Sequence, residues 1–209
     1  MTVRATTRPV KTSRLRLRLT RAFALCVLLA LALGVTNWSL GHPLVEQTLF
    51  FTGITLAGFG AAGRAWATSY ISGLKMKELV TSGPYSLCRN PLYFFSFILG
   101  IGFGFCTKTL TIPIVIAAVM GVLYYFQIKR EERKLAERFG DAYQQYLATI
   151  PRFFPRFGHY HEAEQVHIST APLRKGMFGI AFLLILIGVL ELMRGLHEAG
   201  VLPKLFQIY

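Results

Sequence analysis

Two short segments of the chain hold the side chains best suited to chemistry. The first reads SGPYSLCRNPLY and carries Tyr85, Arg89 and Tyr93 between two apolar runs. The second contains the adjacent carboxylates Glu131 and Glu132, just after another apolar run ends. Guanidinium, phenol and carboxylate groups can all bind a polar ligand through hydrogen bonds or charge. Whether they can meet at one site depends on the elements that carry them.

The segment SGPYSLCRNPLY is predicted to be a rigid loop that leads into a helix. Gly83 and Pro84 form a turn signal near its start. Further on, Asn90 precedes Pro91; a residue before proline avoids the helical conformation, and proline suits the first helical turn. We expect the Asn90 side chain to accept a hydrogen bond from a free backbone N–H, at a helix N-terminus that favours negative charge. The alternative is a cap with a structural role only.

The elements around these segments are predicted to cross a membrane. Of the 209 residues, 53% are hydrophobic and 16% are charged, which is more apolar than a soluble domain. A helix spans a bilayer with roughly 20 apolar residues, and its backbone hydrogen bonds are satisfied internally. The sequence therefore predicts an all-α, polytopic membrane bundle of about five transmembrane helices. The expected spans are residues 22–40, 47–63, 92–107, 109–128 and 176–193.

Lysine and arginine collect in alternate connections between these spans. They are frequent before residue 22, in 64–91 and in 129–175, whereas 41–46 has none and the third-to-fourth turn has only Lys108. Basic connections stay on the cytoplasmic side of a membrane. We therefore expect the N-terminus and both chemically interesting segments to be cytoplasmic. The net charge of +13 is then mostly juxtamembrane, which favours anionic lipid over nucleic acid as a partner.

The N-terminal region also has the composition of a cleaved signal or organelle presequence. Its uncharged stretch continues to His42, which is longer than a typical signal core and favours a retained span.

No metal site and no disulfide framework are expected. The cysteines are odd in number and two of them lie in expected spans, while the histidines after the second segment lack the spacing of a helical pair. These residues are Cys26, Cys88, Cys106, His159, His161 and His167.

The second segment is predicted to leave the membrane as a helix. Leu135 and Phe139 lie four residues apart and share one face. Gly140 is a natural stop, and a second short helix after it would present Tyr143 and Tyr146 on one side.

The two carboxylates lie near the start of this cytoplasmic helix. Glu131 and Glu132 are about 100° apart around its axis, so they can both reach one small ligand only if it lies along the helix flank. The alternative is that both glutamates merely keep the emerging helix solvated.

In order and spacing, these motifs resemble a superfamily of integral membrane methyltransferases. It contains isoprenylcysteine carboxyl methyltransferase and the phospholipid (phosphatidylethanolamine) N-methyltransferases. The family pattern is Gly-Pro-Tyr, Arg-His-Pro-x-Tyr, a helical hairpin, Glu-Glu, Phe-Gly, two tyrosines and a proline-containing close. The resemblance extends over residues 67–155, less than half of the chain. It rests on Gly83, Pro84, Tyr85, Arg89, Pro91, Tyr93, Glu131, Glu132, Leu135, Phe139, Gly140, Tyr143, Tyr146, Pro151, Arg152 and Phe153.

The resemblance implies S-adenosylmethionine as cofactor, in a pocket between the loop and the glutamate helix. It also implies a lipid-like or hydrophobic acceptor that enters from the bilayer, with an O, N or S nucleophile, and no metal. Arg89 and Glu132 are the expected catalytic residues, as orienting or charge-stabilising groups. The expected cofactor-binding residues are Gly83, Pro84, Tyr85, Arg89, Asn90, Pro91, Tyr93, Glu131 and Glu132.

The same resemblance divides the chain into four parts. Residues 1–21 form a basic cytoplasmic segment, and 22–66 hold the first two transmembrane helices. Residues 67–155 form the methyltransferase core. Residues 156–209 are an extension with a fifth transmembrane helix, for which the family offers no counterpart.

One departure from the family pattern keeps other functions open. The family histidine before the proline is Asn90 here, so no imidazole is available at this position to accept a proton. One alternative is an NADPH-dependent membrane reductase of the sterol and steroid type, which has a similar helix start; the glutamate pair favours the methyl donor. The other is a catalytically silent membrane scaffold.

Overall fold

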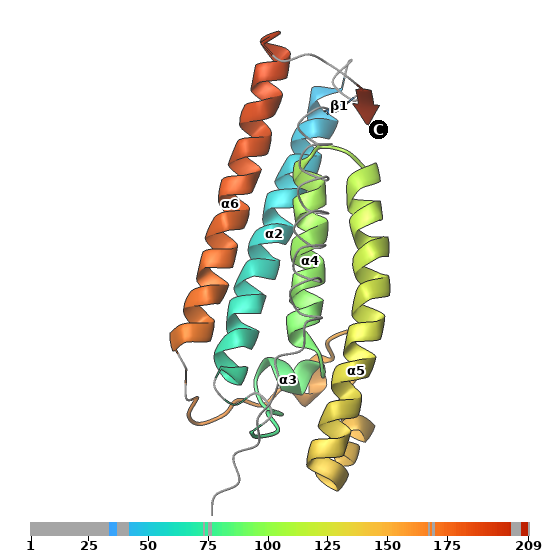
Figure 1. The fold of residues 1–209 in the computed structure, drawn as a ribbon, viewed down its shortest axis with the longest axis vertical. Helices are drawn as coiled ribbons and strands as arrows, with labels where there is room; N and C mark the ends of the chain where they lie inside the picture. Colours follow the sequence, from blue (N-terminus) through green and yellow to red (C-terminus); the bar gives the residue numbers. More distant parts are fainter. Residues whose placement is uncertain are drawn as a thin grey trace, which may run out of the picture.

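The protein is a helical bundle in which one shorter helix lies between longer ones. The computed structural model describes residues 34–36, 42–72, 74, 77–166, 168, 170–201 and 206–208. Helix α4 (Pro91–Cys106) lies between α2 (Pro43–Ile71) and α5 (Thr111–Thr149), and α6 (Thr170–Glu198) flanks α2 (Figure 1). The short helices α3 (Pro84–Leu87) and η2 (Phe157–His159) lie at one end, called here the α3 end. The predicted all-α membrane bundle is confirmed.

Four of the five expected spans coincide with helices. Helices α2 and α5 and the Gly176–His197 part of α6 are long and apolar enough to cross a membrane, and α4 is a shorter apolar helix. Helix α2 is longer than the expected span because it continues through Trp66 to Ile71. The expected first span, 22–40, lies outside the described residues except for three positions.

Those three positions form a strand, so the helix expected there is wrong. Strand β1 (Gly34–Thr36) pairs in parallel with β2 (Phe206–Ile208), and Val35 lies opposite Gln207. Glycine is a poor helix former, and Val35 and Thr36 are β-branched residues that favour strands. The partner strand comes from the far end of the chain, which a local pattern does not reveal.

Small residues let α2 and α4 approach closely. The face of α2 toward α4 carries glycines and alanines, and they are buried. A Cβ atom added to Gly60 would lie 2.6 Å from the backbone nitrogen of Leu99, and one added to Gly102 would overlap the backbone of Ala57. Close backbone contact between small residues is how helices pack in membranes, where burial of apolar surface from water supplies little.

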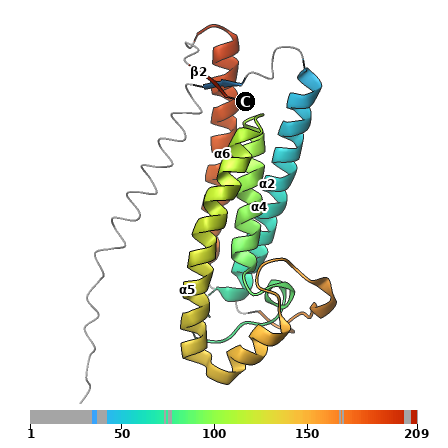
Figure 2. The same cartoon turned by 90° about the vertical axis from the view of Figure 1, so that its right-hand side faces the viewer.

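Helix α5 breaks at Gly140, as the sequence predicts. This glycine has φ 51° and ψ −126°, which is not helical, and residues 141–149 turn back beneath the bundle (Figure 2). Tyr143 and Tyr146 then share a buried cluster with Ile150, packed by Leu135, Phe139 and neighbouring apolar side chains. The turn brings the end of α5 up against α3.

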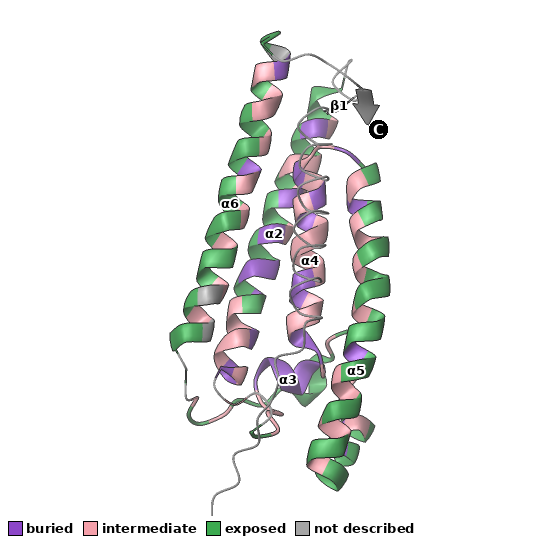
Figure 3. Cartoon of the chain, in the orientation of Figure 1, coloured by how far each residue is buried: buried purple, intermediate pink, exposed green. Residues whose placement is uncertain are grey.

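The outer faces of α5 and α6 are apolar and exposed in the isolated chain (Figure 3). Exposed side chains such as Val122, Phe126, Phe182 and Ile185 are suited to lipid contact. At the end remote from α3, Lys108 Nζ lies 2.6 Å from Glu191 Oε1, and Arg194 pairs with the buried Glu46. These two ion pairs attach α6 to the rest of the bundle.

Candidate active site at the α3 end

Helix α3 is a buried scaffold built around Gly83. Gly83 has φ 59° and ψ −130°, and its N–H donates to the carbonyl of His161 at 2.8 Å. The Ser86 hydroxyl donates to the Gly83 carbonyl at 2.6 Å, and the Tyr146 hydroxyl donates to the Tyr85 carbonyl at 2.7 Å. The loop is thus shaped by Gly83, Pro84 and Tyr85. The end of α5 holds this loop from one side, and the segment that follows α5 holds it from the other.

Two predicted site residues, Arg89 and Asn90, meet around the Glu132 carboxylate. Arg89 Nη1 lies 3.5 Å from Glu132 Oε1, and both side chains are only 14% exposed. Arg152, which the sequence analysis did not assign to the site, places Nη2 2.6 Å from Glu132 Oε2. Asn90 Nδ2 lies 3.4 Å from Glu132 Oε1. We call Arg89, Asn90, Glu132 and Arg152 the Glu132 cluster.

The prediction that the Asn90 side chain caps helix α4 is wrong. Helix α4 begins at Pro91 with Asn90 at the N-cap position, as predicted, but no side-chain capping hydrogen bond forms. The Asn90 amide instead donates to the Arg152 carbonyl at 3.0 Å and reaches toward Glu132. A capping group must accept a hydrogen bond, whereas Asn90 uses its NH₂ group as a donor to the neighbouring segment.

The Glu132 cluster also joins two backbone segments. The Arg89 N–H donates to the Pro151 carbonyl at 2.9 Å, and the Arg156 N–H donates to the Leu87 carbonyl at 3.0 Å. These bonds hold the backbones that carry Arg89 and Arg152 together, and the Glu132 carboxylate then orients the two guanidinium groups.

Glu131 has different neighbours from Glu132, as their angular separation predicts. The Tyr93 hydroxyl hydrogen-bonds the Glu131 carboxylate and also contacts Gln127. The Tyr93 ring packs edge-on against Tyr124, with 4.9 Å between centroids. The predicted residues therefore fall into two adjacent groups: the Glu132 cluster, and a seam between α4 and α5 that holds Tyr93 and Glu131.

Buried polar atoms in this region lack partners among the described residues. They are the Tyr85 hydroxyl and the Nε atoms of Arg89 and Arg152. A buried donor without a partner destabilises a protein by about 1–3 kcal/mol, so such atoms usually await a ligand or water. With two guanidinium groups around one carboxylate, the Glu132 cluster also carries an excess positive charge.

Burial keeps several groups of this region in their neutral forms. Loss of solvent raises the pKa of Cys88 to about 12 and that of Tyr143 to about 12. The pKa values of Tyr85 and Tyr146 are raised further, mainly by burial; the next cause is the charge interaction with Tyr146 for Tyr85 and with Cys88 for Tyr146. Cys88 is therefore a neutral thiol at physiological pH, consistent with a small loop residue and not a nucleophile.

Stability is therefore expected to fall as the pH rises from about 9 to about 12. In the unfolded chain the Cys88 thiol and the tyrosines ionise near pH 9 and 10, while the folded protein keeps these protons. The unfolded state then binds fewer protons, so the free energy of unfolding decreases by about 1.4 kcal/mol per pH unit and group. The melting temperature in detergent measures this decline.

Cys88→Ala provides the control for the alkaline transition. It removes one titrating group. Above pH 9 its free energy of unfolding should therefore fall less steeply with pH than that of the wild type, by the contribution of one proton. A melting temperature that stays flat to about pH 12, or an unchanged slope in Cys88→Ala, would contradict the assignment.

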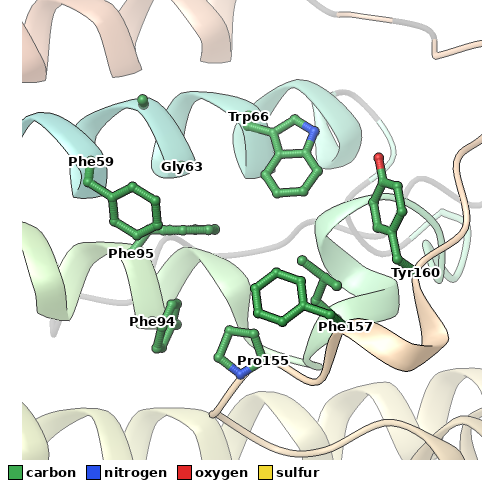
Figure 4. A pocket seen from close by; sticks show the side chains of 10 residues that line it. Phe59, Gly63, Trp66, Phe94, Phe95, Pro155, Phe157 and Tyr160 are labelled. Atoms are coloured by element: carbon green, nitrogen blue, oxygen red, sulfur yellow. The ribbon is translucent and has the colours of Figure 1, made fainter.

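An apolar cavity of about 640 Å³ opens beside α3. Its walls come from α2, α4 and residues 155–160, and the rings of Trp66 and Tyr160 lie 6.2 Å apart between centroids (Figure 4). Leu87 connects the cavity to the loop that carries Arg89. The lining residues are Phe59, Ala62, Gly63, Trp66, Leu87, Phe94, Phe95, Pro155, Phe157 and Tyr160.

One residue that sequence reasoning did not assign to the site, Arg152, carries a local signal. Arg152 stands between Pro151 and Phe153 in the proline-containing close, directly after the helix that Gly140 turns back, so its return to Glu132 follows from that turn. No comparable signal marks Tyr160, which lies beyond the resembling region. Among the described residues no group of three His, Cys, Asp or Glu side chains could hold a metal ion.

Known proteins match much of this chain. The family model of phospholipid methyltransferase matches residues 49–142. The cobalt-zinc-cadmium resistance protein CzcN of Cupriavidus metallidurans is 34% identical over 192 residues, which cover 91% of this chain and 87% of that protein. The nickel-cobalt-cadmium resistance protein NccN of Alcaligenes xylosoxydans xylosoxydans is 29% identical over 185 residues, 87% of this chain and 85% of that protein. No solved structure matches. The family match includes Arg89, Glu131 and Glu132 and ends before Arg152.

Proposed function

Because the chain belongs to the phospholipid methyltransferase family of integral membrane proteins, we propose that it is an enzyme that transfers a methyl group from S-adenosylmethionine to a hydrophobic acceptor. The observation that supports this most directly is the juxtaposition at the α3 end. A charged cluster with unpaired buried donors lies beside a cavity lined by apolar side chains.

The side chains at the α3 end suit the charges of the donor. The excess positive charge of the Glu132 cluster suits the methionyl carboxylate, which Arg89 and Arg152 would hold as forks. Glu131 would accept hydrogen bonds from ribose hydroxyls or the amino group. The rings of Tyr93 and Tyr124 would offer aromatic surface to the sulfonium.

The bound donor supplies an electrophilic methyl group, and the protein contributes position and a dry environment. Glu132 orients Arg89 and Arg152, and Asn90 ties the same carboxylate to the segment that carries Arg152. Buried neutral side chains such as Tyr143 keep water away from this region. An in-line displacement in which charge disappears gains most from such positioning and exclusion of water.

The hydrocarbon part of the acceptor would occupy the apolar cavity. A volume of about 640 Å³ lies within the usual range for ligand pockets, roughly 300–1,000 Å³. Its walls come from membrane-spanning helices, so an amphiphile could enter sideways from the bilayer. In this proposal the α3 end lies on the cytoplasmic side of the membrane, which the basic connections favour.

The metal-resistance names of the relatives fit an indirect role. CzcN and NccN are named for resistance to cobalt and other metals. The described part of this chain lacks a metal-binding cluster. We therefore propose that any contribution to metal resistance here would depend on methylation of a membrane component.

Methyl transfer can be tested without knowledge of the acceptor. Membranes that contain the protein are incubated with donor labelled on the methyl group, and label is followed in the solvent-extracted lipid and in the protein fraction. We expect label to enter one fraction, and Glu131→Ala to lower donor affinity at least tenfold by removing an acceptor worth about 1.5–3 kcal/mol. Arg133→Ala, which changes an exposed side chain of the same helix, is the matched control. Incorporation equal to that of membranes without the protein would overturn the proposal.

A further inference from the structure

Among the described residues, one arginine of α2 has no carboxylate partner. Arg64 lies in α2, seven residues before Ile71, or about 10 Å from the helix end at 1.5 Å per residue. Its guanidinium donates to the Ser96 hydroxyl of α4. Among the described residues no carboxylate lies within ion-pairing distance of Arg64.

A hydrogen bond to Ser96 holds this guanidinium near the seam between α4 and α5. The buried Ser96 hydroxyl donates to the Leu92 carbonyl at 2.6 Å, so its oxygen is left to accept from Arg64. Ser96 also shares a hydrogen bond with Tyr124 of α5, whose ring packs on Tyr93. Arg64, Ser96 and Tyr124 thus form a polar group that links three helices.

The remaining donors of Arg64 are accessible. Arginine has five N–H donors, and Ser96 is its hydrogen-bond partner among the described residues. The Arg64 side chain is exposed in the isolated chain, whereas Ser96 is buried. At about 10 Å from the helix end, the guanidinium lies near the boundary between hydrocarbon and headgroups. Arginine favours bidentate binding of phosphate at such positions.

We propose that Arg64, Ser96 and Tyr124 form a binding site for a phosphate-type anion, carried by a lipid headgroup or free in solution. This site adjoins the apolar cavity, whose walls include the neighbouring residues Gly63 and Phe95 but none of these three. It requires no methyl transfer. If the proposed function holds, an anionic amphiphile bound here would lie beside Tyr93 and Glu131, and so beside the donor.

Trp66 reports on lipid at this end of α2, because its ring lines the adjoining cavity two residues after Arg64 and Trp38 is the only other tryptophan. In a Trp38→Phe background, the protein is placed in nanodiscs of phosphatidylcholine, and quenching by brominated phosphatidylglycerol is compared with quenching by brominated phosphatidylcholine. One arginine near the surface attracts an anionic lipid by about 1 kcal/mol, so we expect about a fivefold preference for phosphatidylglycerol.

The variants assign this preference to a residue. Arg64→Gln should abolish it, and Arg64→Lys should retain a part of it. Arg130→Gln, an exposed arginine of α5 with the same change in charge, should leave it intact. An unchanged preference in Arg64→Gln would overturn the proposal, as would equal losses in Arg64→Gln and Arg130→Gln.

A second arm identifies the source of the anion. Inorganic phosphate is added at an ionic strength held constant with chloride. Loss of the lipid preference would show that free phosphate takes the site, and its persistence would assign the site to the headgroup. Binding of S-adenosylhomocysteine by Arg64→Gln is measured in parallel: unchanged binding together with a lost lipid preference separates this site from the donor site.

Discussion

Gly83→Ala is expected to destabilise the protein far more than Gly140→Ala. The two glycines have almost the same backbone conformation, φ 59° and ψ −130° for Gly83 and φ 51° and ψ −126° for Gly140. A residue other than glycine is strained at these φ and ψ values, by about 1–3 kcal/mol. Their surroundings differ, since a Cβ atom at Gly140 would meet nothing within 4 Å, whereas one at Gly83 would overlap the Tyr70 ring. Gly140→Ala thus measures strain alone, and Gly83→Ala measures strain plus the clash.

The clash acts on a contact network that holds the loop. Moving Gly83 away from Tyr70 would break its hydrogen bond with the His161 carbonyl and disturb the Ser86 bond beside it. We expect Gly83→Ala to lower the free energy of unfolding by about 3 kcal/mol more than Gly140→Ala, since overpacking a buried site adds roughly 1–3 kcal/mol and the lost hydrogen bond adds about 1. Melting temperatures in detergent make the comparison. Equal losses of stability in the two variants would show that the loop accommodates the added methyl group without further destabilisation.

Glu132→Gln is expected to lower both stability and donor binding. The substitution keeps the shape of the side chain but removes the charge that neutralises Arg89 and Arg152. Leaving a buried charge without its partner destabilises proteins by about 3–5 kcal/mol. Because Arg152 is 40% exposed, solvent screens part of this loss, and we expect about 2 kcal/mol. Affinity for S-adenosylhomocysteine should fall at least tenfold, because the two arginines lose their relative position.

Two further variants distinguish an effect specific to the Glu132 cluster from a general effect of charge. Glu137→Gln removes an exposed carboxylate from the same helix and should change neither property. Glu132→Gln combined with Arg152→Gln removes the uncompensated cation and should recover part of the lost stability. If Glu137→Gln matched Glu132→Gln, or the double variant were additive, the Glu132 cluster would not act as a unit.

Local signals predicted the start of α4 and the break in α5. Pro91 and Gly140 act through their own backbone preferences, so the structure needs no distant partner to confirm them. The spacing of Tyr143 and Tyr146 likewise predicts the side of a helix that is buried. The separation of Glu131 and Glu132 into two environments follows from helix geometry alone.

Interactions between distant segments could not be predicted in the same way. The Asn90 amide binds Arg152, and Gly83 binds His161, because α5 turns back and the following segment returns to α3. Such pairs depend on the path of the chain in space. The strand Gly34–Thr36 is a similar case, since its hydrogen bonds come from Phe206–Ile208 at the other end of the sequence.

Calorimetric titration of the purified protein with S-adenosylhomocysteine, with NADPH in parallel, tests the central claim most directly. The methyltransferase proposal predicts saturable binding of S-adenosylhomocysteine that is lost in Tyr93→Ala and Glu131→Ala, and no binding of NADPH. Binding of NADPH alone would support a membrane reductase. Binding of neither ligand by a folded protein would contradict the proposal and favour a scaffold without catalytic activity.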